Sequence, residues 1–381
     1  MLKVSLRWLL GYILLSFFGV SFAEDKEDSI VIMIGVDGLR ADTLDRMSVP
    51  NLQLLANAGV RANMIPAMPT KTFVNFYSLA TGLHPKHHGF ISNFPYDRKI
   101  GRKFNRQADV SDPKWWGGEP IWITAEKQGI KTATYFWVGS EVEIDGVRPS
   151  FWKPYQKSKD YAERVNEVLA WLALPDKKRP RLVTLYFSAV DTAAHRFGVG
   201  SIQEQAAIAK VDKHIGDLLL GLKKLGIKKR TNIVVVADHG MANLSDQRVI
   251  NLDSWIDLSA FVVPDWSKTN MSVHAPFLNL YAEPKVVDAA YETLIDVHPH
   301  LRVLRRGAFP DNYHFDHPQR EPDLMLLADT GWSIYASRDK RQPQPRLKSS
   351  HTIATHGYDN KDPLMQATFI ASGPAFKKKI T

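Results

Sequence analysis

The stretch that decides the fold is Ser29-Ile30-Val31-Ile32-Met33-Ile34-Gly35-Val36-Asp37-Gly38, a short apolar run that ends at an aspartate and a glycine. An uninterrupted apolar run of this length is typical of a strand buried on both faces of a parallel sheet. Three similar runs follow along the chain: Leu182 to Val190, Asn232 to Ala237 and Phe369 to Ala371. We therefore expect buried parallel strands at the centre of the molecule.

Segments with helical periodicity lie between these runs. They are Asn51 to Ala58, Thr72 to Ala80, Tyr161 to Leu172 and Ile202 to Leu225. Strands that alternate with helices predict an α/β fold, a doubly wound and mostly parallel sheet flanked by helices. Ligands of such sheets bind beyond the carboxyl ends of the strands. Asp37, Asp191 and Asp238 all follow an expected strand, which is why we interpret them as candidate site residues rather than scattered surface charges.

The first 23 residues are predicted to be a signal peptide. Lys3 and Arg7 form a basic start, residues 8–20 are almost wholly apolar, and Ser21-Phe22-Ala23 is a small-x-small cleavage pattern. The alternative is an uncleaved anchor, but the apolar run is shorter than the ~20 residues that a spanning helix needs. We therefore expect export to the periplasm or the medium, with no stable membrane anchor.

The rest of the chain is expected to be one catalytic domain with an inserted lobe. Residues 24–250 form the predicted core, residues 251–349 the inserted cap, and residues 350–381 return to the core. The cap segment is rich in proline, tryptophan and basic residues, and its periodicity is weaker. The chain has no cysteine, so an exported form does not depend on disulfide bonds.

The formal net charge of +9 allows a surface that attracts anionic substrates, although an ordinary solvated surface would explain the charge equally well. We find no nucleic-acid-binding motif and no internal repeat in the sequence. Specific nucleic-acid binding is therefore not expected. The sequence leaves the oligomeric state open.

Seven side chains carry the expected chemistry. They are three carboxylates, three imidazoles and one hydroxyl: Asp37, Asp191, Asp238, His195, His239, His356 and Thr72. This set suits two zinc ions and an activated nucleophile, and so indicates metal-assisted phosphoryl transfer. Taken singly, each residue has an ordinary explanation, because aspartate and threonine are common helix caps and most histidines are not metal ligands.

The spacing of these residues gives local expectations. Asp191 and His195 are four apart and share a face if their segment is helical. Asp238 and His239 can hold one metal if the backbone turns after the strand, which Gly240 permits. Thr72 begins a predicted helix, whose N-terminus favours a phosphate. Thr70 and Thr72 could each instead be the helix cap.

Longer motifs resemble the nucleotide pyrophosphatase/phosphodiesterase family of the alkaline phosphatase superfamily. The run from Pro69-Thr70-Lys71-Thr72-Phe73-Val74-Asn75 to Gly82-Leu83-His84-Pro85 is similar to the family's nucleophile segment, and His88-Gly89-Phe90-Ile91-Ser92-Asn93 is similar to its His-Gly-x-x-x-Asn stretch. Thr355-His356-Gly357-Tyr358 is a third match. The chain departs from the family pattern at Val74, where a proline is usual, and at Ala194, where a glycine is usual.

The resemblance implies a role for each matching residue. One zinc is implied at Asp191, His195 and His356, and the other at Asp37, Thr72, Asp238 and His239. The resemblance implies that Thr72 is the nucleophile and forms a phospho-threonine intermediate, from which water releases a nucleoside monophosphate. It implies that Asn93 donates to a non-bridging phosphate oxygen. Phe73 and Tyr155 match residues that sandwich a nucleobase, and Tyr186 matches a residue that lines the pocket.

Several alternatives remain open. A choline- or glycerol-phosphodiester phosphodiesterase, a phosphomonoesterase and a non-catalytic relative that binds metal or nucleotide are the rivals. The two aromatic rings favour a nucleotide, because a stacked base contributes ~1–3 kcal/mol per contact. Carboxylate and imidazole ligands also suit manganese or iron, so zinc rests on the resemblance.

Overall fold

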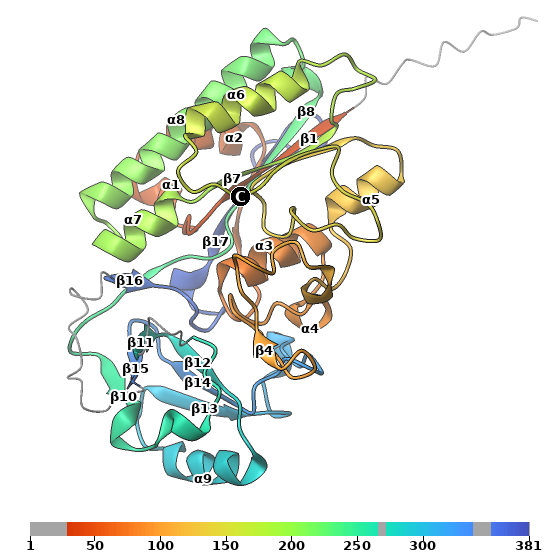
Figure 1. Cartoon of the computed structure of the whole chain (residues 1–381). Helices are drawn as coiled ribbons and strands as arrows, with labels where there is room; N and C mark the ends of the chain where they lie inside the picture. Colours follow the sequence, from red (N-terminus) through yellow and green to blue (C-terminus); the bar gives the residue numbers. More distant parts are fainter. Residues whose placement is uncertain (1–28, 266–271, 338–351, 381) are drawn as a thin grey trace, which may run out of the picture.

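The computed structural model describes residues 29–265, 272–337 and 352–380. The expected signal peptide lies outside the described residues, as does part of the expected cap. A seven-stranded sheet forms the centre, with the strand order β2-β17-β8-β1-β7-β5-β6 (Figure 1). Its strands are β1 (Ile30–Val36), β2 (Val60–Met64), β5 (Thr132–Tyr135), β6 (Phe151–Lys153), β7 (Leu182–Phe187), β8 (Thr231–Val236) and β17 (Ala367–Ser372).

The expected fold class is confirmed. Strand β1 pairs in parallel with β7 and with β8, and β5 pairs in parallel with β6 and β7. Strand β17 instead pairs antiparallel with both β8 and β2. The expectation that Phe369 to Ala371 forms a parallel strand is therefore wrong. An apolar run indicates burial, but it carries no information on strand direction.

Helices cover both faces of the sheet. The helices are α1 (Thr43–Arg46), α2 (Pro50–Ala58), α3 (Thr72–Thr81), α4 (Pro85–His88), α5 (Ile121–Lys127), α6 (Tyr161–Leu172), α7 (Ala189–Phe197), α8 (Ile202–Lys224) and α9 (Pro284–Leu294). Figure 1 shows α2, α6, α7 and α8 on one side of the sheet and α3 and α5 on the other. The four expected helices match α2, α3, α6 and α8 to within one residue at each end.

One expected strand is too long. The run from Leu182 to Val190 splits into β7, which ends at Phe187, and the first turn of α7. Apolar residues continue across the junction because the start of α7 is also buried, so the strand and the helix cannot be separated by periodicity.

A second hydrophobic core lies in the segment between the last two strands of the main sheet. Strands β10 (Val249–Asn251), β15 (Ser333–Ser337) and β11 (Ser272–Ala275) form one small sheet, and β12 (Phe277–Leu280), β14 (Leu324–Ala328) and β13 (Leu301–Arg305) form another. Leu278, Leu280 and Leu326 are fully buried in this core together with Leu294 of α9. The remaining strands are the short pairs β3 (Tyr96–Asp97) with β4 (Arg102–Lys103) and β9 (Ala242–Asn243) with β16 (Ala354–Thr355).

A buried ion pair ties this second core to the loops of the main domain. The guanidinium of Arg320 donates through Nε to Asp97 Oδ2 at 2.9 Å. It also donates to the carbonyl oxygens of Gly89 at 2.9 Å and Trp115 at 2.8 Å. Because each acceptor belongs to the segment between α4 and α5, Arg320 fixes the loops that lie beside the start of α3.

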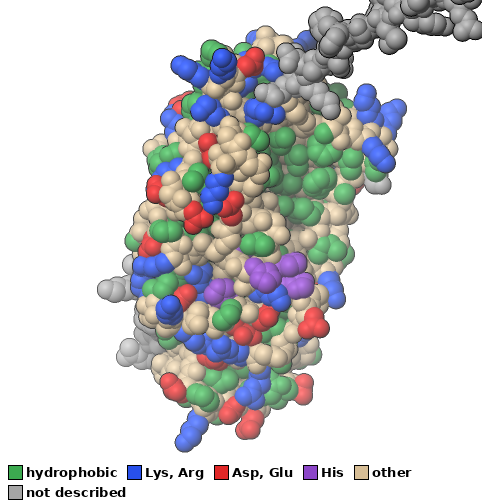
Figure 2. Space-filling model, turned by 90° about the vertical axis from the view of Figure 1, so that its right-hand side faces the viewer, with side chains coloured by type: hydrophobic (Ala, Val, Ile, Leu, Met, Phe, Trp, Pro, Cys, Tyr) green, Lys and Arg blue, Asp and Glu red, His purple; other side chains and the backbone are tan. Residues whose placement is uncertain are grey.

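Within the described ranges, no helix has both the length and the apolarity needed to cross a membrane. Figure 2 shows Lys and Arg side chains interspersed with Asp and Glu over much of one face. On that face, the net positive charge is therefore not gathered into a single basic patch.

Candidate active site

Three carboxylates meet at the carboxyl edge of neighbouring strands. Asp37 directly follows β1, Asp238 follows β8 by two residues, and Asp191 lies in the first turn of α7 after β7. Strands β8, β1 and β7 are adjacent in the sheet, so their carboxyl ends bring the side chains together. Gly38 has φ +72°, and a Cβ there would lie 3.0 Å from the Cα of Asp191. The backbone therefore turns sharply at Gly38, where a side chain would not fit.

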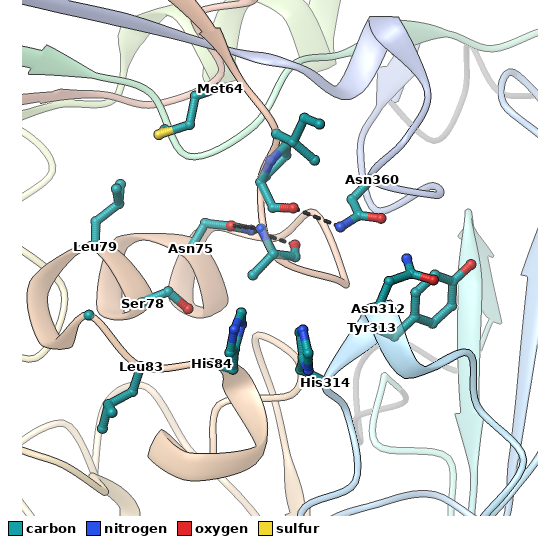
Figure 3. A pocket seen from close by; sticks show the side chains of 14 residues that line it. Met64, Asn75, Ser78, Leu79, Leu83, His84, Asn312, Tyr313, His314 and Asn360 are labelled. Atoms are coloured by element: carbon teal, nitrogen blue, oxygen red, sulfur yellow. Dashed lines mark hydrogen bonds between the residues drawn. The ribbon is translucent and has the colours of Figure 1, made fainter.

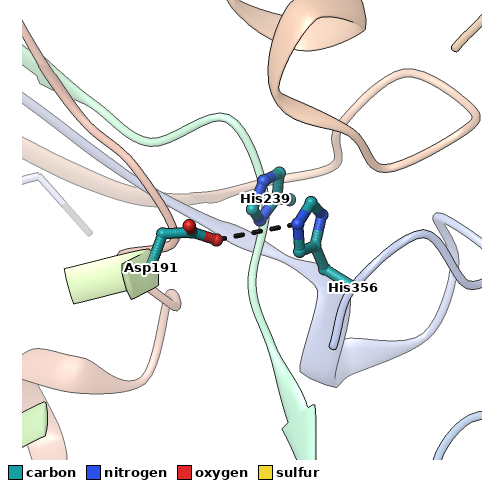
Figure 4. A group of neighbouring side chains, drawn as sticks. All are labelled: Asp191, His239 and His356. Atoms are coloured by element: carbon teal, nitrogen blue, oxygen red, sulfur yellow. Dashed lines mark ion pairs between the residues drawn. The ribbon is translucent and has the colours of Figure 1, made fainter. Parts of the chain in front are cut away.

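The histidines approach the carboxylates from three separate segments. His195 lies one helical turn after Asp191 on α7, and its Nε2 is 3.2 Å from Asp191 Oδ1. His356 follows β16, and its Nε2 is 3.6 Å from the same oxygen, as Figure 4 shows. His239 Nε2 lies 2.8 Å from Asp238 Oδ2 and 3.5 Å from Asp37 Oδ1.

Gly240 matters for a different reason from the one expected. Its φ is not positive, so the turn does not depend on left-handed backbone. A Cβ on Gly240 would instead lie 2.0 Å from the carbonyl oxygen of Leu364. The absence of a side chain therefore lets the segment before β17 pack closely behind Asp238 and His239.

Each of the three imidazoles is held by its other ring nitrogen. His195 Nδ1 lies 2.7 Å from the carbonyl oxygen of Ala354, and His356 Nδ1 lies 2.7 Å from that of Thr70. His239 Nδ1 lies 2.9 Å from the carbonyl oxygen of Gly240. A carbonyl can only accept, so each Nδ1 carries the proton. Each Nε2 consequently turns a lone pair toward the carboxylates, which is the arrangement found around metal-binding histidines.

The carboxylates of Asp37 and Asp238 are likewise each held through one of their two oxygens. Asp37 Oδ2 accepts a hydrogen bond from the hydroxyl of Tyr186, and Asp238 Oδ1 accepts one from the backbone N–H of Gly38 at 3.0 Å. Asp37 Oδ1, Asp238 Oδ2 and Asp191 Oδ1 are buried and accept no hydrogen bond from the described residues. Three carboxylate oxygens and three imidazole Nε2 atoms therefore converge, and none of these oxygens has a hydrogen-bond donor among the described residues.

The pKa directions reflect this crowding of acceptors. Burial raises the pKa of Asp238 to about 8. Burial, reinforced by the charges of Asp238 and Asp191, raises the pKa of Asp37 well above its ordinary value. Burial lowers the pKa of His239, and burial together with the charge of His239 lowers that of His356. These groups carry an electrostatic cost in the apo chain that a bound cation would remove.

The residues fit divalent metal ions. A tetrahedral ion with ligands at 2.0–2.1 Å separates its ligand atoms by about 3.3 Å. The separations of 3.2 and 3.6 Å at Asp191 and of 2.8 and 3.5 Å at His239 bracket this value. Among the described residues, two groups have ligand atoms within 4.8 Å of one another: Asp37, Asp238 and His239, and Asp191, His239 and His356.

These groups differ in one detail from the expected ligand sets. His239 lies between the two groups, and its ring stacks on that of His356 with centroids 3.5 Å apart. His195 contacts the cluster through Asp191, and its ring centroid is 5.0 Å from that of His356. The structure thus brings the six expected carboxylate and imidazole ligands into one continuous cluster.

The two threonines before α3 have different surroundings. Thr70 is buried, donates to the carbonyl oxygen of Tyr358 at 3.1 Å and accepts from the N–H of Gly357 at 2.9 Å. Thr72 Oγ1 lies within hydrogen-bond distance of His239 Nε2, at 3.4 Å. The hydroxyl of Thr70 is therefore occupied in holding the loop of His356, whereas that of Thr72 faces the cluster.

The side chain of Asn93 is oriented by the start of α3. Its Oδ1 accepts a hydrogen bond from the backbone N–H of Phe73 at 2.9 Å. Its Nδ2 donates no hydrogen bond to any residue that the structure describes. The amide is thereby fixed with its donor end free, next to the nucleophile candidate Thr72.

The three aromatic candidates lie around this cluster in different settings. The ring of Phe73 packs against Phe90 and Phe104, with centroids 5.8 and 5.9 Å apart. Tyr155 is 44% exposed, and its ring lies 6.2 Å from that of Tyr186. Tyr186 is buried and donates its hydroxyl to Asp37, so its clearest contact is with a candidate metal ligand.

Two features of the site were not predicted from the sequence: the bond from Tyr186 to Asp37 and the placement of Arg106 at Phe73. Tyr186 was expected to line a pocket, and its bond to Asp37 depends on the register of β7 against β1, which pairs Tyr186 with Gly35. Arg106 was not singled out, yet its guanidinium lies over the ring of Phe73, 4.8 Å from the centroid. A lone arginine in an irregular segment has no pattern that would reveal it.

A separate cavity of about 410 Å³ lies beside α3. Asn75 and Ser78 of α3 line it, together with His84 and His314, whose rings stack with centroids 3.8 Å apart (Figure 3). None of the candidate metal ligands lines this cavity. The candidate active site is therefore the cluster at the strand ends.

Comparison with known proteins identifies the family of the chain. The family described as type I phosphodiesterase / nucleotide pyrophosphatase matches residues 31–359. An uncharacterized pyrophosphatase/phosphodiesterase of Schizosaccharomyces pombe is 38% identical over 354 residues, which cover 92% of this chain and 72% of that protein. Venom phosphodiesterase 2 of Crotalus adamanteus is 37% identical over 360 residues, which cover 93% of this chain. The match spans only 43% of the venom protein's own length.

Solved structures give the same result. Murine ectonucleotide pyrophosphatase/phosphodiesterase 5 superposes with a TM-score of 0.83 at 30% sequence identity, covering 93% of this chain and 90% of the murine chain. An inactive variant of the murine protein, solved in complex with AMP, superposes equally well. The match over residues 31–359, the relatives above 30% identity and the shared fold show that the chain belongs to the type I phosphodiesterase / nucleotide pyrophosphatase family.

Proposed function

We propose that this chain hydrolyses nucleotide phosphodiesters or pyrophosphates to nucleoside monophosphates through a phospho-threonine intermediate on Thr72. The observation that carries the proposal is the hydroxyl of Thr72, which lies beside six converging ligands and contacts one of them, His239. Thr72 Oγ1 lies 3.4 Å from His239 Nε2, at the first residue of α3. Phosphoryl transfer requires a nucleophile and a cationic environment in this juxtaposition.

Two zinc ions are the proposed cofactors. Asp191, His195 and His356 would hold one, and Asp37, Thr72, Asp238 and His239 the other. When bound, such ions neutralise the carboxylates, lower the pKa of a hydroxyl and polarise the phosphoryl oxygens. The buried, unpartnered oxygens of the three aspartates support the proposal.

The chain's own residues carry the reaction in two steps. In the first, the Thr72 oxygen loses its proton and attacks phosphorus, a bond from Thr72 to phosphorus forms, and the ester or anhydride oxygen leaves and takes up a proton. In the second, water attacks the same phosphorus, the bond to Thr72 breaks, and the nucleoside monophosphate departs while the Thr72 oxygen takes up a proton that the water has lost. Thr72 begins a ten-residue helix, whose N-terminal dipole favours the phosphate.

Asn93 is proposed to stabilise the charge that develops on a non-bridging phosphate oxygen. Its Nδ2 is the free end of an amide whose Oδ1 is already bonded to Phe73 N–H. A donor fixed before the substrate arrives needs no reorganisation in the transition state, and one such donor contributes about 3–4 kcal/mol.

Phe73 and Tyr155 are proposed to flank the base, with Tyr186 holding Asp37 at the edge of the pocket. The solved complex of the murine relative with AMP supports a nucleotide as the substrate class. Tyr155 is 44% exposed, so its ring is accessible to a base.

We also propose export after cleavage of residues 1–23. Relatives include venom phosphodiesterases and proteins named ectonucleotide pyrophosphatases. For the described part of the chain, we propose a catalytic core at residues 24–250 and 350–381 with a lobe at residues 251–349. The separate hydrophobic core around Leu280 and Leu326 supports that division.

A substrate panel tests the proposal. Purified, zinc-loaded protein is assayed on a nucleotide diester, a nucleotide pyrophosphate, a choline phosphodiester and a phosphate monoester, with Thr72→Ala as the inactive control. We expect the two nucleotide substrates to have the highest kcat/KM. A higher kcat/KM on the choline ester or the monoester would contradict the proposal.

A further inference from the structure

Arg106, which is not among the predicted site residues, lies in a loop that several hydrogen bonds hold in place. Arg106 lies between β4 and the short helix η1 (Pro113–Trp115). Asp109 accepts from the N–H of Asn105 at 2.8 Å, and its own N–H donates to the carbonyl oxygen of Asn105 at 2.8 Å. Arg102 adds two bonds to the carboxylate of Asp109, at 2.6 and 2.8 Å. The position of Arg106 is therefore fixed by its neighbours before any ligand binds.

The guanidinium of Arg106 stacks between two aromatic rings. It lies 4.8 Å from the ring centroid of Phe73 and 4.4 Å from that of Phe94. Phe73 follows the proposed nucleophile, and Phe94 follows Asn93. The cation is thus placed at the base-stacking residue, and cation–π contact with two rings stabilises it there.

No residue that the structure describes satisfies the hydrogen-bonding capacity of Arg106. It forms no ion pair or hydrogen bond with them, and its Nε is a buried donor without a partner. Burial lowers the pKa of the guanidinium, while nearby Tyr186, Asp37 and Asp191 raise it, followed by Tyr155. A buried cationic donor without a partner is costly, and so it points to a ligand rather than to packing.

The surroundings of Arg106 identify the half of the substrate that it meets. Phe73 is one of the two rings proposed to flank the base, and Tyr155, the other, is close enough to influence the guanidinium. A guanidinium beside a stacking ring can reach the edge of a base held against that ring. Guanine presents two acceptors, O6 and N7, on one edge, whereas adenine presents a donor amino group beside N7.

We propose that Arg106 is a substrate-binding residue that donates to the edge of the base and makes the chain prefer guanosine nucleotides to adenosine nucleotides. The inference rests on the proposed nucleotide phosphodiesterase function and adds a base preference to it. The guanidinium of an arginine can donate two hydrogen bonds, one to O6 and one to N7 of guanine. On adenine it would instead meet the amino group beside N7, which is also a donor.

The test compares substrates that differ only in the base. Zinc-loaded wild type, Arg106→Met and Arg106→Lys are assayed on the p-nitrophenyl esters of GMP and AMP and on bis(p-nitrophenyl) phosphate, which has no base. We expect wild type to favour the GMP ester by roughly 5- to 150-fold in kcat/KM. Arg106→Met should remove this preference and Arg106→Lys should reduce it, and both should lower kcat/KM on the GMP ester more than on the baseless diester.

Lys99→Met is the matched control, because Lys99 is exposed, lies in the same region and loses the same single charge. Its base preference should equal that of wild type. Thermal stability, recorded for every variant, separates loss of fold from loss of recognition.

Two results would overturn the inference. One is that Arg106→Met lowers kcat/KM equally on both nucleotide esters and that Arg106→Lys restores it, which would make Arg106 a general anion-binding group. The other is an equal loss on all three substrates. A wild type that turns over nucleotide esters no better than the baseless diester would instead contradict the proposed function itself.

Discussion

The imidazole rings of His239 and His356 lie stacked, with centroids 3.5 Å apart and an angle of 12° between their planes. His239 follows β8 and His356 follows β16, and each donates Nδ1–H to a different backbone carbonyl. Both present Nε2 to the same group of carboxylates. Two protonated rings this close would repel each other. Burial lowers the pKa of both histidines, so they remain neutral and able to bind a cation.

Replacing the proposed nucleophile should abolish turnover without emptying the metal site. We expect Thr72→Ala to lower kcat by on the order of 10³-fold or more, because no phospho-threonine can form. Metal content should stay near that of wild type, since six other side chains surround the ions. Activity assays and metal analysis on the same preparation make the measurement.

Thr70→Val is the control for this experiment. It removes the bonds to Gly357 and Tyr358, so it should lower the free energy of unfolding by about 1–3 kcal/mol while a phosphorylated Thr72 can still form. Substantial turnover by Thr72→Ala, combined with loss of the phosphoenzyme in Thr70→Val, would reverse the two roles.

Metal analysis should find two ions per chain. His195→Ala should weaken the ion near Asp191, and His239→Ala the ion near Asp37 and Asp238, because each removes a nitrogen from a different carboxylate group. Removing both ions with a chelator should stop turnover and lower the Tm. A fully active protein that contains one ion per chain would rule out the two-metal scheme.

Removing the hydroxyl of Tyr186 should weaken metal binding without changing the fold. It donates to Asp37 Oδ2, and loss of such an outer bond to a ligand typically costs roughly 10- to 100-fold in metal affinity or activity. We therefore expect Tyr186→Phe to bind zinc less tightly in a competition titration.

Tyr77→Phe is the matched control. The hydroxyl of Tyr77 is also buried, but it has no hydrogen-bond partner among the residues described, so its removal should leave metal affinity unchanged and stability equal or higher. Equal affinities for Tyr186→Phe and wild type would show that Asp37 needs no support from the hydroxyl.

The two proposed stacking rings should respond differently to truncation. Tyr155 is 44% exposed, so Tyr155→Ala should lower kcat/KM on a nucleotide ester by roughly 1–3 kcal/mol, or about 5- to 150-fold, with little loss of Tm. A baseless aryl diester should be affected much less. Equal losses on both substrates would favour the choline- or glycerol-phosphodiester alternative.

Phe73→Ala should produce a mixed result. Phe73 packs on Phe90 and Phe104, so its loss should also destabilise the fold, by up to about 3–5 kcal/mol. Phe73→Leu keeps much of the packing but not the stacking face. A nucleotide-specific loss in Phe73→Leu would assign the ring to the base.

The metal-free protein should become less stable as the pH rises from about 7 to 8, above the ordinary histidine pKa of about 6.5, where the lowered pKa values of His239 and His356 no longer contribute. Burial raises the folded pKa of Asp238 to about 8, above the ordinary carboxyl value of about 3.9. Between these values the folded Asp238 carboxyl binds more protons than the unfolded one, so its contribution to the free energy of unfolding falls with increasing pH. Thermal melts of chelated and zinc-loaded protein measure this, and the zinc-loaded form should not show the fall.

The sequence by itself determined the fold class, the helices and the chemical identity of the site. The apolar run that ends at Asp37 and the helical segments between such runs predict a buried sheet. Both patterns can be recognised from the order of apolar and polar residues along the chain. The candidates Asp37, Asp191, Asp238, His195, His239, His356 and Thr72 could be named because their residue types and motifs are local.

Only the tertiary structure decided how these groups act on one another. The antiparallel direction of β17, the bond from Tyr186 to Asp37, the use of Thr70 to hold the His356 loop and the placement of Arg106 against Phe73 all join segments distant in sequence. Such contacts depend on strand register and on loop packing, which residue order does not encode locally. The ends of β8, β1 and β7 bring the carboxylates together, and packing turns the hydroxyl of Thr72, rather than that of Thr70, toward them.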